Sequence, residues 1–146
     1  MALFKRRDRG PANSESDQVT AFPIKFSGPA PYAKPLGGEF GVVFEDDGAT
    51  GYFYATDGSN TEILDALHVY DCQTTDALQA GDQVFVVWNP ARRRAGLFYR
   101  ERFQAVFDFA AKRGVCRTGA PPVSASSSWS APGHDWDEAF IGGLEP

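Results

Sequence analysis

Three consecutive carboxylates, Glu45, Asp46 and Asp47, precede a glycine and are the first residues of the chain that could do chemistry. A calcium loop of the EF-hand type alternates its oxygen ligands and ends with a glutamate that binds through both oxygens. The acids here are adjacent, so in an extended strand they point to opposite faces, and no acid follows at the required spacing. The segment therefore predicts a hairpin turn with Asp47-Gly48 at its tip and no bound metal.

Two histidines supply the other candidate ligands or bases. His68 lies in an apolar stretch, which favours a structural role. His134 opens the sequence HDWDE and is followed closely by Asp135 and Asp137, but the cluster lacks the H-E-x-x-H spacing of a zinc site. Because carboxylates stabilise the positive end of a helix, the favoured interpretation is a helix start. The alternative is a small metal-assisted or hydrolytic site.

Cys116 is the candidate nucleophile, because Arg113 and Arg117 flank it in the sequence and nearby cations lower the pKa of a thiol. Pairing with a histidine would complete such a site, but no sequence pattern brings the two residues together. With Cys72 the chain has two cysteines, too few for a disulfide framework, so reduced thiols in a cytoplasmic protein are predicted. The sequence lacks G-x-S-x-G, P-loop and G-x-G-x-x-G motifs and predicts no cofactor.

The charges are segregated along the chain, which has a net charge of −5. The segment 35–91 has no Lys or Arg and ten acids: Glu39, Glu45, Asp46, Asp47, Asp57, Glu62, Asp65, Asp71, Asp76 and Asp82. The segment 92–117 has two acids and eight basic residues: Arg92, Arg93, Arg94, Arg100, Arg102, Lys112, Arg113 and Arg117. Either the two halves neutralise each other across a sheet, or the first half forms an acidic face that attracts a basic partner.

The acidic alternative gives the candidate binding residues Glu45, Asp46, Asp47, Asp57, Glu62 and Asp65. The expected partner is a protein with a basic surface. The basic segment, with its neighbouring aromatic rings, resembles a nucleic-acid patch, but the acidic remainder of the chain argues against nucleic acid. No apolar run approaches the roughly 18 residues that span a membrane, so no membrane association is expected.

The elements that must position these residues are mostly strands. Alternating apolar and aromatic residues in 39–46, 50–57, 83–88, 96–100, 104–109 and 114–118 are separated by turn signals, and 22–26 predicts a short edge strand. The segment 62–71 is predicted to be mostly strand, although its first half could instead be helical. Most of the following side chains are expected to point into one core: Phe40, Val42, Phe44, Phe53, Val84, Val86, Phe107 and Phe109. The segments 28–38 and 121–133 are predicted to be loops. We expect a mainly β domain over 21–146, an antiparallel meander forming a sandwich or half-barrel with one short C-terminal helix, after a disordered tail over 1–20.

Several segments together resemble a bacterial domain-of-unknown-function family, DUF2251, from about Gly38 to Ile141: GEFGVVFEDDGATGYFYATD, ILDALHVYD, AVFDF, RGVCRTG and HDWDEA. The family has no established activity, so the resemblance implies no catalytic residue and no cofactor. In the family an Asn-Gly and a Pro-His pair often precede AVFDF, whereas this chain has Phe103 and Gln104 there. The difference implies that a catalytic histidine is not required at that position.

These observations favour a non-catalytic, cytoplasmic bacterial accessory protein that binds another protein. Neutralisation of a basic toxin by an acidic immunity-like protein is one specific form of that function. The alternative is a small hydrolase-like or metal-assisted enzyme that uses Cys116 or the cluster of His134, Asp135 and Asp137. The sequence does not indicate the oligomeric state.

Overall fold

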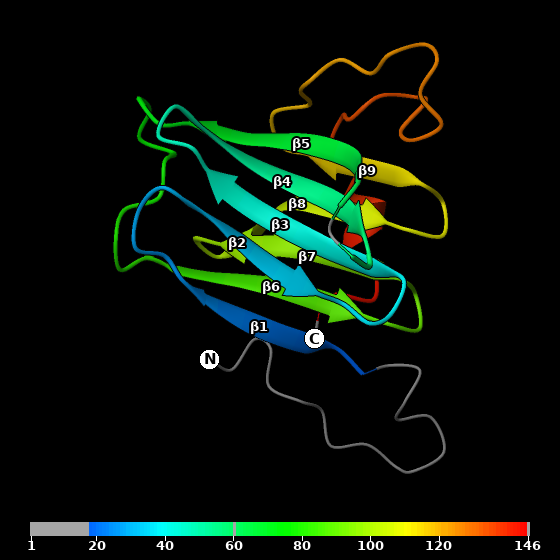
Figure 1. Ribbon diagram of the computed structural model, residues 1–146, viewed down its shortest axis with the longest axis horizontal. Coiled ribbons are helices and arrows are strands. Elements are labelled where there is room, and N and C mark those ends of the chain that lie inside the picture. Colours follow the sequence, from blue (N-terminus) through cyan, green and yellow to red (C-terminus); the bar gives the residue numbers. More distant parts are fainter. Residues whose placement is uncertain (1–17, 60, 146) are drawn as a thin grey trace.

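The computed structural model describes residues 18–59 and 61–145, which form two antiparallel sheets (Figure 1). In chain order the strands are β1 (Thr20–Lys25), β2 (Ala30–Pro35), β3 (Phe40–Asp46), β4 (Thr50–Asp57), β5 (Ile63–Asp71), β6 (Gln83–Asn89), β7 (Arg94–Tyr99), β8 (Arg102–Asp108) and β9 (Arg113–Cys116). A single turn of 3-10 helix, η2 (Glu138–Ile141), follows. The predicted mainly β fold is confirmed.

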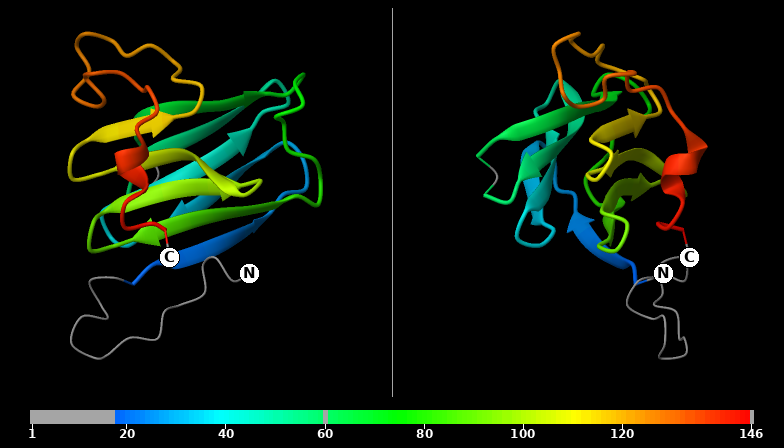
Figure 2. Two further views of the ribbon diagram at one scale, coloured as in Figure 1. Left: turned by 180° about the vertical axis from the view of Figure 1, so that it is seen from behind. Right: turned by 90° about the vertical axis from the view of Figure 1, so that its right-hand side faces the viewer.

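Each sheet contains a meander of consecutive strands. The four-stranded sheet has the order β2-β3-β4-β5, and the five-stranded sheet has the order β1-β6-β7-β8-β9. The chain therefore starts in the five-stranded sheet, crosses to the other sheet, and returns beside its first strand. The two sheets stack as separate layers (Figure 2). Of the two predicted arrangements, the structure is the sandwich and not the half-barrel.

The main core lies between the two layers. The residues predicted to point into it do so, with Phe40 partly buried and the others buried: Phe40, Val42, Phe44, Phe53, Val84, Val86, Phe107 and Phe109. Rings from opposite sheets stack directly, with centroids 5.2 Å apart for Phe53 and Phe107. The pair Phe40 and Phe109 is closer, at 4.4 Å. Aromatic contact across the layers holds the sheets face to face.

A second apolar cluster lies on the outer side of the five-stranded sheet, where the C-terminal segment covers it (Figure 2). Phe140 and Leu144 pack onto Phe98, Phe103 and neighbouring valines. The outer face of the four-stranded sheet is different, because the side chains that alternate outward from β3, β4 and β5 are half-exposed and mostly polar. The two faces of the sandwich therefore meet solvent with different chemistry.

The prediction for one loop needs correction. The segment 28–38 was predicted to be a loop but contains β2; its prolines are tolerated because β2 is an edge strand, where a missing N–H breaks no inner ladder. The predicted short C-terminal helix is η2, a single 3-10 turn. The predicted hairpin turn at Asp47-Gly48 joins β3 to β4, with a positive φ of 88° at Gly48. Most of the predicted tail, residues 1–17, lies outside the described residues, and Thr20 already begins β1.

Candidate functional site

The segregated charges of the sequence lie on different sheets. The acidic segment supplies β3, β4 and β5 of the four-stranded sheet and, after its last acid, β6 of the other sheet. The basic segment supplies β7, β8 and β9 of that five-stranded sheet. Within residues 18–59 and 61–145, one of the ten acids of segment 35–91 forms an ion pair with an arginine: Asp82, 3.6 Å from Arg100. The remaining Arg–carboxylate pairs, Arg94 with Asp108 and Arg117 with Glu138, stay within the second half of the chain.

The six predicted binding residues separate into two groups. Asp47 and Glu62 are exposed, and Glu45 and Asp57 are half-exposed. Asp46 is 5% exposed, and the Asp65 side chain is 9% exposed, so both belong to the interior. Three further acids of segment 35–91 are exposed: Glu39, Asp71 and Asp76. We define the acidic surface as six of the solvent-accessible carboxylates: Glu45, Asp47, Asp57, Glu62, Asp71 and Asp76.

Asp47 shapes the tip of the β3–β4 hairpin. Its Oδ1 accepts hydrogen bonds from the backbone N–H groups of Ala49 and Thr50, both at 2.8 Å. These bonds, that of Thr50 first, lower the pKa of Asp47 below its usual value, so the tip is ionised at neutral pH. No group of three or more His, Cys, Asp or Glu residues gathers in the described part of the chain to hold a metal ion. That the tip binds no metal stays a prediction.

An aromatic platform lies on the outer face beside the carboxylates. The rings of Tyr52 and Tyr54 stack with centroids 5.7 Å apart, and His68 meets Tyr52 edge-on at 5.5 Å. The Tyr54 hydroxyl donates to Glu45 at 3.3 Å. Burial, followed by the charge of Glu45, raises the pKa of Tyr54 to about 12, so the phenol keeps its proton. Half-exposed tyrosines beside carboxylates are a surface on which a guanidinium group can stack.

His68 is held between two polar groups in a triad-like row. Its Nε2 lies 2.9 Å from Asp71 Oδ1, and its Nδ1 lies 3.1 Å from the Thr118 hydroxyl. Thr118 donates its own proton to the His68 carbonyl oxygen at 2.8 Å. Because that proton points away from the imidazole, the histidine is not placed to remove it. The row joins β5 to the segment after β9 and favours a structural role for His68.

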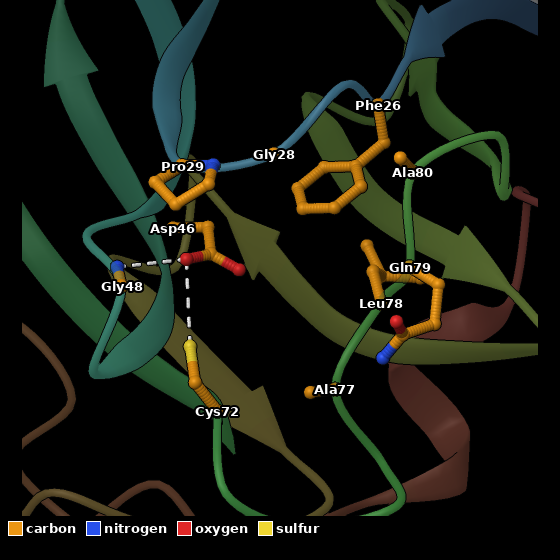
Figure 3. Close-up of a pocket in the computed structure, with 10 residues that line it drawn as sticks. All are labelled: Phe26, Gly28, Pro29, Asp46, Gly48, Cys72, Ala77, Leu78, Gln79 and Ala80. Carbon is orange, nitrogen blue, oxygen red and sulfur yellow. Dashed lines mark hydrogen bonds between the residues drawn. The ribbon is translucent and has the colours of Figure 1, made fainter.

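Asp46 forms the floor of a network at one end of the sandwich. The Tyr70 hydroxyl donates to its Oδ2 at 2.6 Å. The Gly48 N–H and the Cys72 thiol donate to its Oδ1, at 2.9 Å and 3.4 Å (Figure 3). A pocket of about 250 Å³ opens above this carboxylate. Three connections form its walls: residues 26–29, 46–48 and 72–80.

Asp65 occupies a second buried network, with His134 and Ser130. His134 Nε2 lies 2.9 Å from Asp65 Oδ1, and the Ser130 hydroxyl donates to Oδ2 at 2.6 Å. The other imidazole nitrogen faces the Pro121 carbonyl oxygen at 2.7 Å. Burial alone would lower the pKa of His134, but the hydrogen bond and charge of Asp65 outweigh it and raise that pKa. The arrangement is an imidazolium–carboxylate pair that ties the C-terminal loop to β5.

The residues that an enzyme would use, Cys116 and the cluster of His134, Asp135 and Asp137, do not form one site, because each has different contacts. The Cys116 thiol is fully buried and donates to the Ala120 carbonyl oxygen at 3.3 Å, and burial raises its pKa. Its flanking guanidinium groups lie over other rings, Arg113 over Phe140 and Arg117 over Trp136. Asp135 is exposed, and Asp137 accepts the Ala139 N–H at 2.9 Å as the cap of η2. These contacts favour a protonated thiol at Cys116 and a helix-capping role for Asp137, rather than an activated nucleophile.

The comparisons with known proteins identify the family of the chain. Residues 33–145 match the bacterial family described as "Uncharacterized protein conserved in bacteria (DUF2251)". The chain belongs to this family. It is 38% identical over 93 residues to an uncharacterized protein of Haemophilus influenzae, across 62% of this chain and 58% of that protein. The chain thus spans less than two thirds of this relative's length. No solved structure matches the chain.

The described residues include no helix of the length and apolarity that crossing a membrane demands.

Several partners in these networks were missed by sequence reasoning: Tyr52, Tyr54, Tyr70, Thr118 and Ser130. Tyr70 and Ser130 lie 24 and 65 positions from the carboxylates they bind, so the pairing depends on sheet register rather than on a local motif. Tyr52 and Tyr54 are two positions apart in a segment with strand alternation, which puts both rings on one side of the strand. That signal could have identified the platform.

Proposed function

We propose that this family member is a non-catalytic bacterial accessory protein that binds another protein through its acidic surface, and that the partner is basic where it makes contact. One observation carries the proposal: among the described residues, the acidic surface forms no ion pair with lysine or arginine. Uncompensated charge of one sign creates a field that steers an oppositely charged partner.

The aromatic platform supports the same proposal. Tyr52 and Tyr54 lie next to Glu45 on a sheet face that is half-exposed. An arginine that approached Glu45 could stack on these rings while its guanidinium satisfies the carboxylate. Nucleic acid is a poor fit to this face because the phosphates would meet carboxylates. Neutralisation of a basic toxin in the cytoplasm, an immunity-like role, is the specific form of the function that this chemistry suits best.

The test is capture from a lysate of the bacterium that encodes the protein, followed by binding of the purified partner. Three immobilised proteins are compared: the wild type, a variant of the acidic surface (Glu62→Lys with Asp76→Lys), and a control with the same change of net charge on the C-terminal segment (Asp135→Lys with Glu145→Lys). All four side chains are exposed, so folding should be preserved. We expect a basic protein, identified by mass spectrometry, on the wild type and the control and much less of it on the acidic-surface variant.

The purified partner must then form a stoichiometric complex with the wild type in solution. Equal retention of the same proteins on all three baits would contradict the proposal, as would a partner that is acidic at its contact surface. The design separates specific use of the acidic surface from a general effect of net charge, because the two variants carry the same net charge.

A further inference from the structure

The pocket above Asp46 lies where three connections meet at one end of the sandwich (Figure 3). Its volume of about 250 Å³ exceeds the roughly 150 Å³ cavity that holds a benzene molecule, so it has room for the end of a long side chain. Phe26, Ala77 and Leu78 supply apolar walls and are buried. Pro29, Gly48 and Gln79 line the pocket and are exposed, so it opens to solvent.

The floor of the pocket carries a buried charge. The Asp46 carboxylate points toward the space between Phe26 and Leu78 (Figure 3). Its three hydrogen-bond partners are neutral donors, a hydroxyl, an amide and a thiol. Among residues 18–59 and 61–145, no lysine, arginine or histidine forms an ion pair with it. Burying a carboxylate is costly unless a cation or several donors compensate it, and here the donors leave a net charge of one.

The neighbouring thiol does not add a second charge. Burial, followed by the hydrogen bond to Asp46, raises the pKa of Cys72 to about 11, so the thiol stays protonated and donates. Oδ2 accepts one bond, from Tyr70, and a carboxylate oxygen can accept two. One acceptor position on the side of the pocket thus remains for a further donor.

The pocket wall is held in place before any ligand binds. Arg100 donates to the carbonyl oxygens of Thr75 and Ala77, both at 2.9 Å, and lies 3.6 Å from Asp82. These contacts hold the middle and the C-terminal end of the connection that carries Ala77 and Leu78. A wall fixed in advance lowers the entropy lost on binding.

We propose that this pocket binds a primary ammonium or guanidinium group on an aliphatic stem, as carried by a lysine or arginine side chain of the basic partner. The cation donates to the remaining acceptor position of Asp46, and its methylene groups lie along Phe26 and Leu78. The source of the cation rests on the proposed function, whereas the chemical class follows from the pocket itself. Asp46, too buried to serve the acidic surface, thereby becomes the charged floor of a specificity pocket beside it.

The first test uses small probes on the full chain, so it needs no partner. Amide NMR shifts are followed during titration with n-butylammonium, n-butylguanidinium and the neutral control 1-butanol. We expect saturable shifts at Gly48, Cys72 and Leu78 for both cations, with a dissociation constant about tenfold lower than that of 1-butanol, which corresponds to one charge-assisted hydrogen bond. Equal response to the alcohol, or shifts confined to other amides, would overturn the proposal.

The second test uses a matched pair of variants on the same connection. Gln79 lines the pocket and Gln73 does not, and both side chains are exposed. In Gln79→Arg the new guanidinium can reach Asp46 from within, so probe affinity should fall about tenfold or more. Gln73→Arg adds the same charge outside the pocket and should leave the affinity within about twofold. Equal weakening in both variants would show a general field and reject the pocket.

Partner binding separates this inference from the proposed function. If Gln79→Arg loses probe binding but keeps full affinity for the captured partner, the pocket does not take a partner side chain and this inference fails, while the acidic-surface proposal stands. If Gln79→Arg weakens the partner and Gln73→Arg does not, both stand. If the charge-reversal pair on the acidic surface has no effect on the partner, the proposed function fails while the probe titration still decides the pocket.

Discussion

At the scale of single residues, three aspartates of the acidic segment have three different structural roles, set by their burial and by the groups they contact. Asp47 is exposed and shapes a turn through backbone N–H groups. Asp46 is buried among neutral donors and faces a pocket. Asp65 is buried against a histidine and a serine from the C-terminal loop. The groups that contact each carboxylate therefore determine its role. Backbone N–H groups make Asp47 a turn residue, neutral donors leave Asp46 able to bind a cation, and a histidine and a serine make Asp65 a link between two segments.

The Asp65–His134 pair makes a prediction about pH. Because the pKa of His134 is raised in the folded protein, folding favours its protonated form. The stability that this pair contributes is fully present below the unfolded pKa of about 6.5 and is lost as the pH rises through the folded pKa. His134→Gln should therefore lower Tm more at pH 5.5 than at pH 9. At the lower pH the loss should be about 3–5 kcal/mol, typical of a broken buried pair.

Thermal unfolding of wild type and variant at both pH values measures this difference. The effects of other titrating groups largely cancel because they are common to the two proteins. A Tm difference that is constant, or that widens toward pH 9, would contradict the imidazolium–carboxylate assignment.

At the scale of elements, a glycine in β4 allows a tyrosine of β5 to reach Asp46. A Cβ atom at Gly51 would lie 2.6 Å from Cζ of Tyr70, whose hydroxyl group donates to Asp46. The strand pairing places Gly51 directly opposite Tyr70. The ring therefore packs over bare backbone, and this packing sets where the hydroxyl group ends beneath the pocket.

Gly51→Ala should consequently destabilise the protein by about 1–3 kcal/mol, the usual range for overpacking. In a Tyr70→Ala background the obstructing ring is absent, so the same substitution should cost close to nothing. Chemical denaturation of the two single variants and the double variant gives the coupling energy. Independent, additive effects would show that the ring does not account for the requirement for glycine.

Sequence reasoning found the elements more readily than the site. Alternation in 39–46 and 50–57 was enough to place Phe44 and Phe53 in the core, because a strand has only two faces. The edge strand β2 was missed because its prolines signal a loop, and only its place at the sheet edge makes them acceptable. The Asp46 and Asp65 networks depend on contacts between residues far apart in the sequence. The sequence therefore did not reveal that two of the six predicted binding residues, Asp46 and Asp65, are buried while the other four are accessible to solvent.

At the scale of the whole molecule, the sandwich separates charge by layer. The four-stranded sheet, with its turns and the connection after β5, carries the acidic surface. The five-stranded sheet carries the basic strands, and part of that basic segment holds the C-terminal segment in place. Arg94 shows this use, with an ion pair to Asp108 at 2.9 Å and hydrogen bonds to the carbonyl oxygens of Ala139 and Gly142. Arg94, Arg113 and Arg117 are engaged by β8 and the C-terminal segment. Among the described residues no lysine or arginine forms an ion pair with the acidic surface, so that surface keeps its field.

The most direct test of this account is the rate at which the purified partner associates with the protein, measured by stopped flow as salt is raised. Screening shortens the reach of exposed charges to about 10 Å at 0.1 M salt, so the association rate of the wild type should fall steeply from low to moderate salt. The Glu62→Lys, Asp76→Lys variant should associate more slowly at low salt and show a shallower dependence, while the Asp135→Lys, Glu145→Lys control should stay close to the wild type. An association rate indifferent to salt and the same in all three proteins would contradict the central claim that the acidic surface steers a basic partner.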